Sequence, residues 1–241
     1  MNKFLTTLGA LALVLGAAGV AQAVSLTDLF AGQSITIGDK LFDQFSLIYE
    51  DTSDFHSVNT DNIDVTALAD NGSGYGLQFD VLNDELYVQG DDIYAYTDFS
   101  FGFHVSVLDP LYKIDDASLE GLDAGTGRTV DGSNDIGSYI LENIGTAAGL
   151  DDLGVLDAEH SVLDDNVFTD LGGSVNFDPQ SEIWVTKNIL VWAVDSTDDA
   201  HLDGFSQRFS QVPIPEPSTW WLMGLGLLGL AGVGRKMAVR A

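Results

Sequence analysis

The chain has 241 residues and no cysteine, with 9 Lys and Arg residues against 37 Asp and Glu residues, for a formal net charge of −28. The lack of cysteine excludes disulfides and cysteine-ligated metal centres. The charge argues against nucleic acid as a partner, because a phosphate backbone needs a basic surface, while a hydrophobic content of 45% is enough to bury a core.

Residues 1–23 have the pattern of an export signal. A lysine near the start supplies a positive charge, and Phe4 to Val20 is apolar and uncharged. Ala21 and Ala23 then form the small-x-small pattern of a signal-peptidase site, which predicts cleavage after Ala23 and a mature chain that begins at Val24. An uncleaved N-terminal anchor is the alternative. We therefore expect signal peptidase as a partner and export across the inner membrane.

Residues 24–212 are expected to form a single β-rich domain. From Phe99 to Val107, apolar and polar side chains alternate, which is the two-residue period of a strand with one buried face. The segment from Ile183 to Val194 is apolar on both faces, which predicts a central strand covered on two sides. Further strands are predicted at 34–37, 41–49, 63–68, 76–82, 93–96, 117–122, 138–144, 161–168, 174–177 and 204–211.

Clusters of Gly, Asn and Asp separate these predicted strands and indicate turns, as at Asp70 to Gly74. Asp151 to Ala158 is expected to form one short helix. Many short strands joined by turns predict a mainly β fold, an antiparallel two-sheet sandwich or jelly roll. A signal helix before it and a short transmembrane helix after it complete the expected architecture.

The predicted domain is strongly acidic and suggests one metal-binding segment. Its basic residues are Lys40, Lys113, Arg128, Lys187 and Arg208. A calcium ion prefers carboxylate and carbonyl oxygens, and the candidate ligands are Asp195, Asp198, Asp199 and Asp203. Their spacing does not match an EF-hand loop, and a solvated acidic turn is the alternative interpretation. No other cofactor is expected.

No catalytic signature is present in the sequence. The histidines (His56, His104, His160 and His201) do not form a zinc motif, and there is neither a Gly-x-Ser-x-Gly elbow nor a phosphate-binding glycine loop. His104 is expected to be a satisfied residue of a sheet. Trp184, Trp192 and the tyrosine and phenylalanine residues could stack on sugars, although alternating aromatic residues in a β-sandwich usually face the core. We predict that the domain is not an enzyme and has no catalytic residues.

The last segment, residues 213–241, has three parts. Pro213, Pro215 and Pro217 predict an extended stretch, because proline fixes φ and lacks an N–H group. An apolar, glycine-rich stretch follows and is shorter than the roughly 20 residues of a comfortable membrane span. The interfacial and basic residues that flank it are Trp220 and Trp221 before it and Arg235 and Lys236 after it. The basic end predicts a cytoplasmic C-terminus and a transient hold in the inner membrane.

This tail resembles the PEP-CTERM sorting signal of Gram-negative bacteria, with Pro215, Glu216 and Pro217 as its motif. The resemblance implies recognition by an exosortase, removal of the tail near the motif, and release or attachment at the cell surface. Proteins with this signal often accompany exopolysaccharide production. The exported domain also resembles a recurrent PEP-CTERM subfamily, for which no activity is established, at residues 26–29, 31–42, 45–46 and 209–212.

The sequence therefore predicts an exported protein of the cell surface or extracellular matrix. Its first expected role is that of a structural component associated with exopolysaccharide. A lectin-like carbohydrate-binding module, with or without calcium, is the second interpretation, and a secreted hydrolase is the third.

Overall fold

The computed structural model describes residues 22–128 and 135–214. Within these residues the helices are α1 (Leu26–Phe30) and a short 3-10 helix, η1 (Thr60–Asn62). Neither helix is long and apolar enough to cross a membrane. The expected signal helix and its Ala21 lie outside the described residues. So do the expected C-terminal helix and the tail residues Pro215, Glu216, Pro217, Trp220, Trp221, Arg235 and Lys236.

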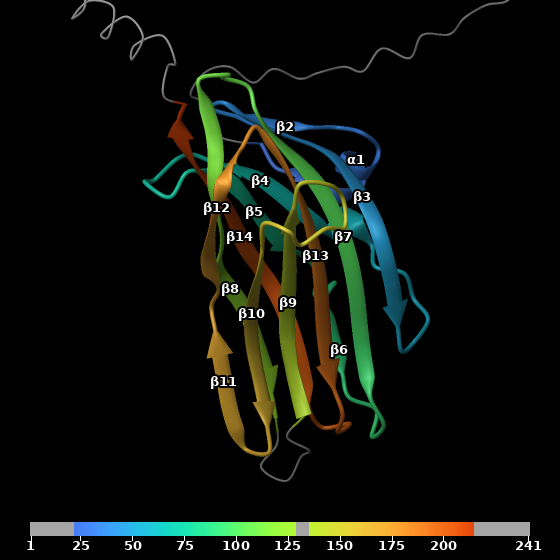
Figure 1. The fold of residues 1–241 in the computed structure, drawn as a ribbon. Coiled ribbons are helices and arrows are strands. Elements are labelled where there is room, and N and C mark those ends of the chain that lie inside the picture. The colour runs from blue at the N-terminus through green and yellow to red at the C-terminus, as the bar shows by residue number, and fades with distance from the viewer. Residues whose placement is uncertain (1–21, 129–134, 215–241) are drawn as a thin grey trace, which may run out of the picture.

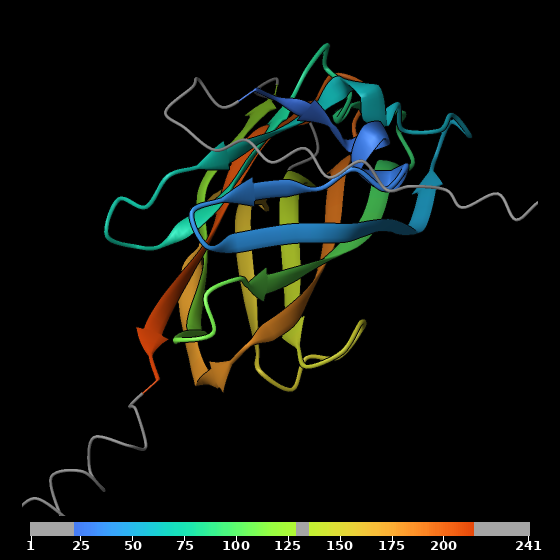
Figure 2. The ribbon, with the colours of Figure 1, turned by 90° about the horizontal axis from the view of Figure 1, so that it is seen from above.

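Two antiparallel sheets stack as the two layers of a sandwich (Figure 1, Figure 2). Sheet A has the order β1 (Val24–Ser25), β4 (Ile63–Leu68), β5 (Tyr75–Val81), β14 (Asp199–Pro213), β8 (Tyr112–Gly127) and β12 (Gly173–Gln180), with β6 (Tyr87–Gln89) also paired to β14. Sheet B has the order β11 (Asn166–Asp170), β10 (Gly154–Leu163), β9 (Asp135–Gly145), β13 (Glu182–Ala193), β7 (Ala95–Val107), β3 (Lys40–Thr52) and β2 (Ile35–Ile37). The predicted fold class is confirmed.

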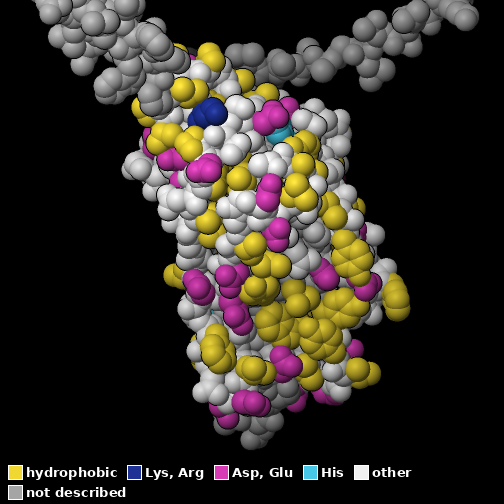
Figure 3. All heavy atoms as spheres, viewed as in Figure 1, with side chains coloured by type: hydrophobic (Ala, Val, Ile, Leu, Met, Phe, Trp, Pro, Cys, Tyr) yellow, Lys and Arg dark blue, Asp and Glu magenta, His cyan; other side chains and the backbone are white. Residues whose placement is uncertain are grey.

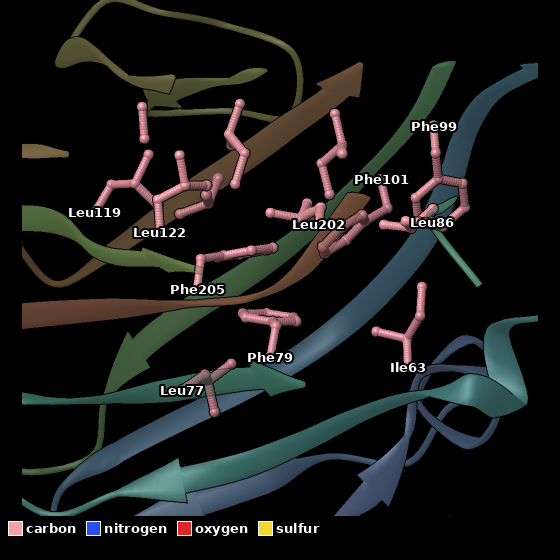
Figure 4. Packing of buried hydrophobic residues seen from close by; sticks show 14 of the residues in the cluster. Ile63, Leu77, Phe79, Leu86, Phe99, Phe101, Leu119, Leu122, Leu202 and Phe205 are labelled. Carbon is pink, nitrogen blue, oxygen red and sulfur yellow. The ribbon is translucent and has the colours of Figure 1, made fainter. Parts of the chain in front are cut away.

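Phenylalanine rings from both sheets meet in the core between the layers. Phe79 of β5 stacks on Phe205 of β14 with ring centroids 4.7 Å apart, and it lies 5.6 Å from the ring of Phe101 on β7 (Figure 4). All three side chains are buried. Burial of a phenylalanine side chain contributes roughly 1.5–3 kcal/mol, so this contact between sheets A and B stabilises the sandwich.

Two predictions about residues 151–168 are wrong. Asp151 to Ala158, expected to form a helix, instead forms the loop before β10 and the first half of that strand. Leu156 and Ala158 are buried and the residues between and beside them are more exposed, which is the two-residue period of a strand. The strand expected over 161–168 is divided by a turn at Asp164 and Asp165, whose φ angles of 47° and 65° are left-handed. Aspartate tolerates that conformation better than most residues, and the chain then returns as β11.

The prediction that the strand at 183–194 is covered on two sides is also wrong. Along β13, buried residues such as Val185 and Val191 alternate with half-buried residues such as Trp184, Leu190 and Trp192. The half-buried set points away from sheet A, and the described chain places no further layer over that side of sheet B (Figure 1). Apolar residues therefore lie on the surface here.

Sequence patterns also missed two strands, because β1 and β6 are too short to show a period. The other predicted strands fall within β2, β3, β4, β5, β7, β8, β9, β12 and β14, allowing for their ends. Pro179 lies in β12, an edge strand, where the register shifts between Asn176 and Gln180. Proline is tolerated there because an edge strand does not need every N–H group.

Candidate functional site

Aromatic side chains gather on the outer side of sheet B, at the end opposite the last residues of β14 (lower half of Figure 3). The strand register places them together, because Trp192 of β13 lies opposite Tyr96 of β7, and Leu190 lies opposite Tyr139 of β9. Directly paired residues of an antiparallel sheet point to the same side. We call this group the aromatic face, and its members are Tyr49, Tyr94, Tyr96, Tyr139, Leu190 and Trp192.

Hydrogen bonds to one carboxylate hold two rings of the aromatic face. The hydroxyl of Tyr96 donates to Oδ2 of Asp51 at 2.7 Å, and the hydroxyl of Tyr49 donates to the same oxygen at 3.4 Å. The ring of Tyr94 lies 5.6 Å from that of Tyr96, tilted by 34°. Tyr49 is 50% exposed and Tyr94 is 39% exposed. The hydrogen bonds at the hydroxyls thus fix the orientation of Tyr49 and Tyr96, while parts of the ring faces stay open to solvent.

Further polar groups lie between the rings of the aromatic face. Nε1 of Trp192 donates to Oδ1 of Asp135 at 2.8 Å, and Nδ2 of Asn188 donates to Oδ1 of Asp98 at 2.8 Å. An ionised carboxylate has about four acceptor positions, so one hydrogen bond does not use its capacity. The face therefore offers apolar ring surface beside hydrogen-bond acceptors.

The carboxylates also change the acidity of the tyrosines. A hydrogen bond to Asp51 is the main cause that raises the pKa of Tyr96, and the negative charge of Asp51 is the main cause that raises the pKa of Tyr49. Burial, followed by the charge of Asp135, raises the pKa of Tyr94. All three phenols therefore remain neutral hydrogen-bond donors at physiological pH.

A polar pocket adjoins the aromatic face. Its volume is about 320 Å³ and Tyr96 forms part of its wall. The other side chains that give it polar character are Ser53, Asp54, His56, Gln89 and Asp91. A ligand that rests on the aromatic face could extend into this pocket.

The four predicted calcium ligands do not converge on one point. Oδ1 of Asp195 accepts hydrogen bonds from the backbone N and hydroxyl of Thr197, and Asp198 is fully buried. Asp199 and Asp203, on β14, line a pocket of about 300 Å³ together with Asp84, Tyr87 and His201. Within residues 22–128 and 135–214, no three His, Asp or Glu side chains are grouped to hold a metal ion. Calcium binding stays a prediction.

The fold makes the surface more acidic than composition alone indicates. Lys40 and Lys187 are fully buried and Arg208 is 8% exposed, so three of the five basic residues of the domain contribute little to its outer surface. Among the described acidic residues, only Glu142 and Asp198 are buried, and the others remain at least partly exposed. The aromatic face itself carries Asp51, Asp98 and Asp135.

Of the two tryptophans that the sequence singled out, only Trp192 belongs to the aromatic face. Trp184 lies at the other end of β13, where its ring is 4.9 Å from that of His104. Nδ1 of His104 is 2.8 Å from Oδ1 of Asp43, so this histidine is satisfied within the sheet as predicted. The sequence named the tyrosines only as a class, and the structure brings Tyr49, Tyr94, Tyr96 and Tyr139 together as candidate residues.

Comparison with known proteins supplies one firm result. Residues 213–236 match a family model described as the PEP-CTERM protein-sorting motif. The chain carries a PEP-CTERM sorting motif. This motif implies export, anchoring through the C-terminus and processing by an exosortase, as the sequence predicted.

Two further comparisons concern the whole chain. Among solved structures, it is similar to TmCBM61 in complex with beta-1,4-galactotriose, at 13% identity, 69% coverage of this chain, 88% coverage of the other chain and a TM-score of 0.25. That score is too low to carry an argument about the site. No curated protein sequence matches the chain.

Calcium and magnesium should raise the melting temperature of the protein equally at matched concentration. The reason is that both ions screen the self-repulsion of a chain with a net charge of −28. Thermal unfolding in matched chloride salts measures this. A rise of several degrees that calcium gives and magnesium does not would instead reveal a specific calcium site.

Asp51→Asn should lower the pKa of Tyr49 and Tyr96 towards the ordinary tyrosine value of about 10. The raised pKa of the two tyrosines stabilises the folded protein at pH values below the tyrosine pKa of the unfolded chain. This stabilisation is lost as the pH rises through the tyrosine pKa of the folded protein. The variant should therefore lose less stability at alkaline pH. Alkaline titration of tyrosine absorbance measures the shift, with Asp28→Asn as a control away from the aromatic face. Identical titrations of wild type and Asp51→Asn would contradict the assigned contacts.

Proposed function

We propose that the mature domain is a component of the cell surface or extracellular matrix that binds a neutral polysaccharide through the aromatic face. The observation that carries the proposal is the group of partly exposed rings on the outer side of sheet B, interleaved with hydrogen-bonded carboxylates. The first interpretation from the sequence, a structural component associated with exopolysaccharide, is retained and given a contact surface. We propose no reaction for the domain.

The chemistry of the aromatic face suits a sugar chain. A pyranose ring has an apolar side of C–H groups and a rim of hydroxyls. Aromatic side chains supply rigid apolar area with a polar tip, and the carboxylates of Asp51, Asp98 and Asp135 supply acceptors for hydroxyl hydrogens. An exposed apolar area of this kind, rimmed by polar groups, is typical of an interaction site.

Charge limits the class of polysaccharide. The net charge of the chain is −28 and the face carries three carboxylates of its own. An anionic polymer would be repelled at ordinary ionic strength. A neutral glycan meets no such penalty, which is why we propose neutral rather than uronic-acid-rich polysaccharide.

The position of the aromatic face fits a protein held by its C-terminus. The strand β14 ends at Pro213 at the upper end of the sandwich in Figure 1, and the sorting motif follows directly. The aromatic face lies at the lower end. Attachment of the processed C-terminus at the cell surface would therefore leave the aromatic face directed away from that surface.

Trp192→Ala should weaken binding to the cognate neutral polysaccharide about thirtyfold or more, because truncation of a central aromatic contact residue costs about 2 kcal/mol or more. The matched control is Trp184→Ala, which removes the same side chain from the same strand and the same side of the sheet, but at the other end. Affinity electrophoresis or calorimetry with polysaccharide from the host measures both variants.

Equal weakening by both tryptophan variants, or no binding by the wild type to any neutral polysaccharide of the host, would contradict the proposed face. The length of the polysaccharide after incubation with the protein distinguishes a binding protein from a hydrolase. Shortened chains would contradict a purely binding role.

Processing gives an independent prediction. Protein recovered from the surface or medium of the host should begin at Val24 and lack the apolar tail, ending near Pro217. Intact mass spectrometry measures this directly. A recovered mass that still contains residues 220–241 would show a permanent anchor and would contradict sorting by cleavage.

A further inference from the structure

A lysine, a glutamate and a glutamine meet inside the sandwich, away from the aromatic face. Lys187 of β13 lies directly opposite Glu142 of β9, and both side chains point from sheet B into the core. Gln207 of β14 reaches the same point from sheet A. All three side chains are fully buried. Burial of such groups is costly unless their charges and hydrogen bonds are compensated.

The lysine amine contacts both of its neighbours. Nζ of Lys187 donates to Oε2 of Glu142, and it donates to Oε1 of Gln207 at 2.8 Å. A C=O bond is about 1.2 Å long, so Cδ of Gln207 lies within about 4 Å of the amine. Nζ also lies 4.9 Å from the ring centroid of Phe205. The amine is thus held close to the amide carbon in an apolar environment, near the separation of about 3–3.5 Å from which bonds form.

Hydrogen bonding in this cluster is incomplete. Among the described buried side chains, Nε2 of Gln207 and Oε1 of Glu142 make no hydrogen bond. An unsatisfied buried polar atom is destabilising. The amide nitrogen is therefore not held in place, and its departure would break no hydrogen bond.

We propose that Lys187 and Gln207 form an intramolecular isopeptide bond that joins sheet B to sheet A, with Glu142 as the proton shuttle. The bond would form within the folded domain and needs no second protein.

The reaction balances without an oxidant or a further reactant. The proton of the Lys187 ammonium passes to Glu142, and the neutral amine attacks Cδ of Gln207. Glu142 then relays a proton from Nζ to Nε2. The bond from Nζ to Cδ forms, the bond from Cδ to Nε2 breaks, and ammonia leaves, while the proton that began on the lysine remains on Glu142. The product has neither a buried ammonium nor a buried carboxylate.

The lowered pKa of Lys187 favours the transfer of its proton to Glu142. Burial lowers the pKa of Lys187, against the opposing charge and hydrogen bond of Glu142. A lower pKa increases the share of neutral amine, which is the nucleophilic form. Gln207 is the acceptor rather than Glu142, because the carbon of a neutral amide accepts a nucleophile more readily than that of a carboxylate.

The location gives the bond a mechanical consequence. Gln207 lies on the strand that ends at Pro213, where the sorting motif begins. Tension applied through an attached C-terminus enters the fold along β14. Without the bond, only the hydrogen bonds between strands would resist that tension. A covalent bond from β14 to β13 would transmit part of it to sheet B.

Mass spectrometry of the full chain, denatured before analysis, tests the proposal. We expect an intact mass below the sequence mass by one ammonia. Trypsin cuts after free lysine, so the peptide from Asn188 to Arg208 should be missing, and its residues should appear joined to those before Lys187. An unchanged mass with release of that peptide would overturn the proposal. Loss of one water, which would indicate an amide between Lys187 and Glu142, would also overturn it.

Two variants assign the role of Glu142. Glu142→Gln should keep the full sequence mass, because the proton shuttle is lost while the amine and the amide remain. Glu182→Gln, an exposed glutamate of the same sheet, is the matched control and should lose ammonia as the wild type does. Circular dichroism verifies that both variants fold. Complete ammonia loss in a folded Glu142→Gln variant would overturn the proposed shuttle.

Discussion

The contact between the phenylalanine rings of the two sheets is the constraint on which the rest of the structure depends. Phe79 and Phe205 of sheet A and Phe101 of sheet B must face each other to be buried. In a strand this choice fixes the direction of every neighbouring side chain, because alternate residues point to opposite sides. With the phenylalanines inward, Tyr96 and Trp192 are directed outward on sheet B. The aromatic face is thus a consequence of core packing.

The same alternation explains how charge is distributed. Lys187 and Glu142 occupy inward positions in strands whose outward positions carry the aromatic face. The fold thus encloses much of its small supply of basic groups and displays its carboxylates. A surface with so little positive charge repels polyanions, which favours contact through aromatic stacking and neutral hydrogen bonding. The predicted export signal, the sorting motif and such a surface are consistent with a protein that works outside the cell.

The two ends of the sandwich have separate tasks in this proposal. One end leads from β14 into the sorting motif and is the end at which the protein is held. The other end presents the aromatic face. The cluster of Lys187, Glu142 and Gln207 lies between them and links the two sheets, so it stands on the path between the held end and the binding end.

The sequence by itself determined the sorting tail, the mainly β class and most strands, because these depend on local order: a motif followed by an apolar stretch, or a period of two over a few residues. It failed at residues 151–168, where Asp164 and Asp165 bend the chain in a conformation that no apolar period reveals. It also could not tell that the outer side of β13 is uncovered. Only the tertiary structure decided the aromatic face, since Tyr49, Tyr96, Tyr139 and Trp192 come from four strands whose register is set by long-range pairing.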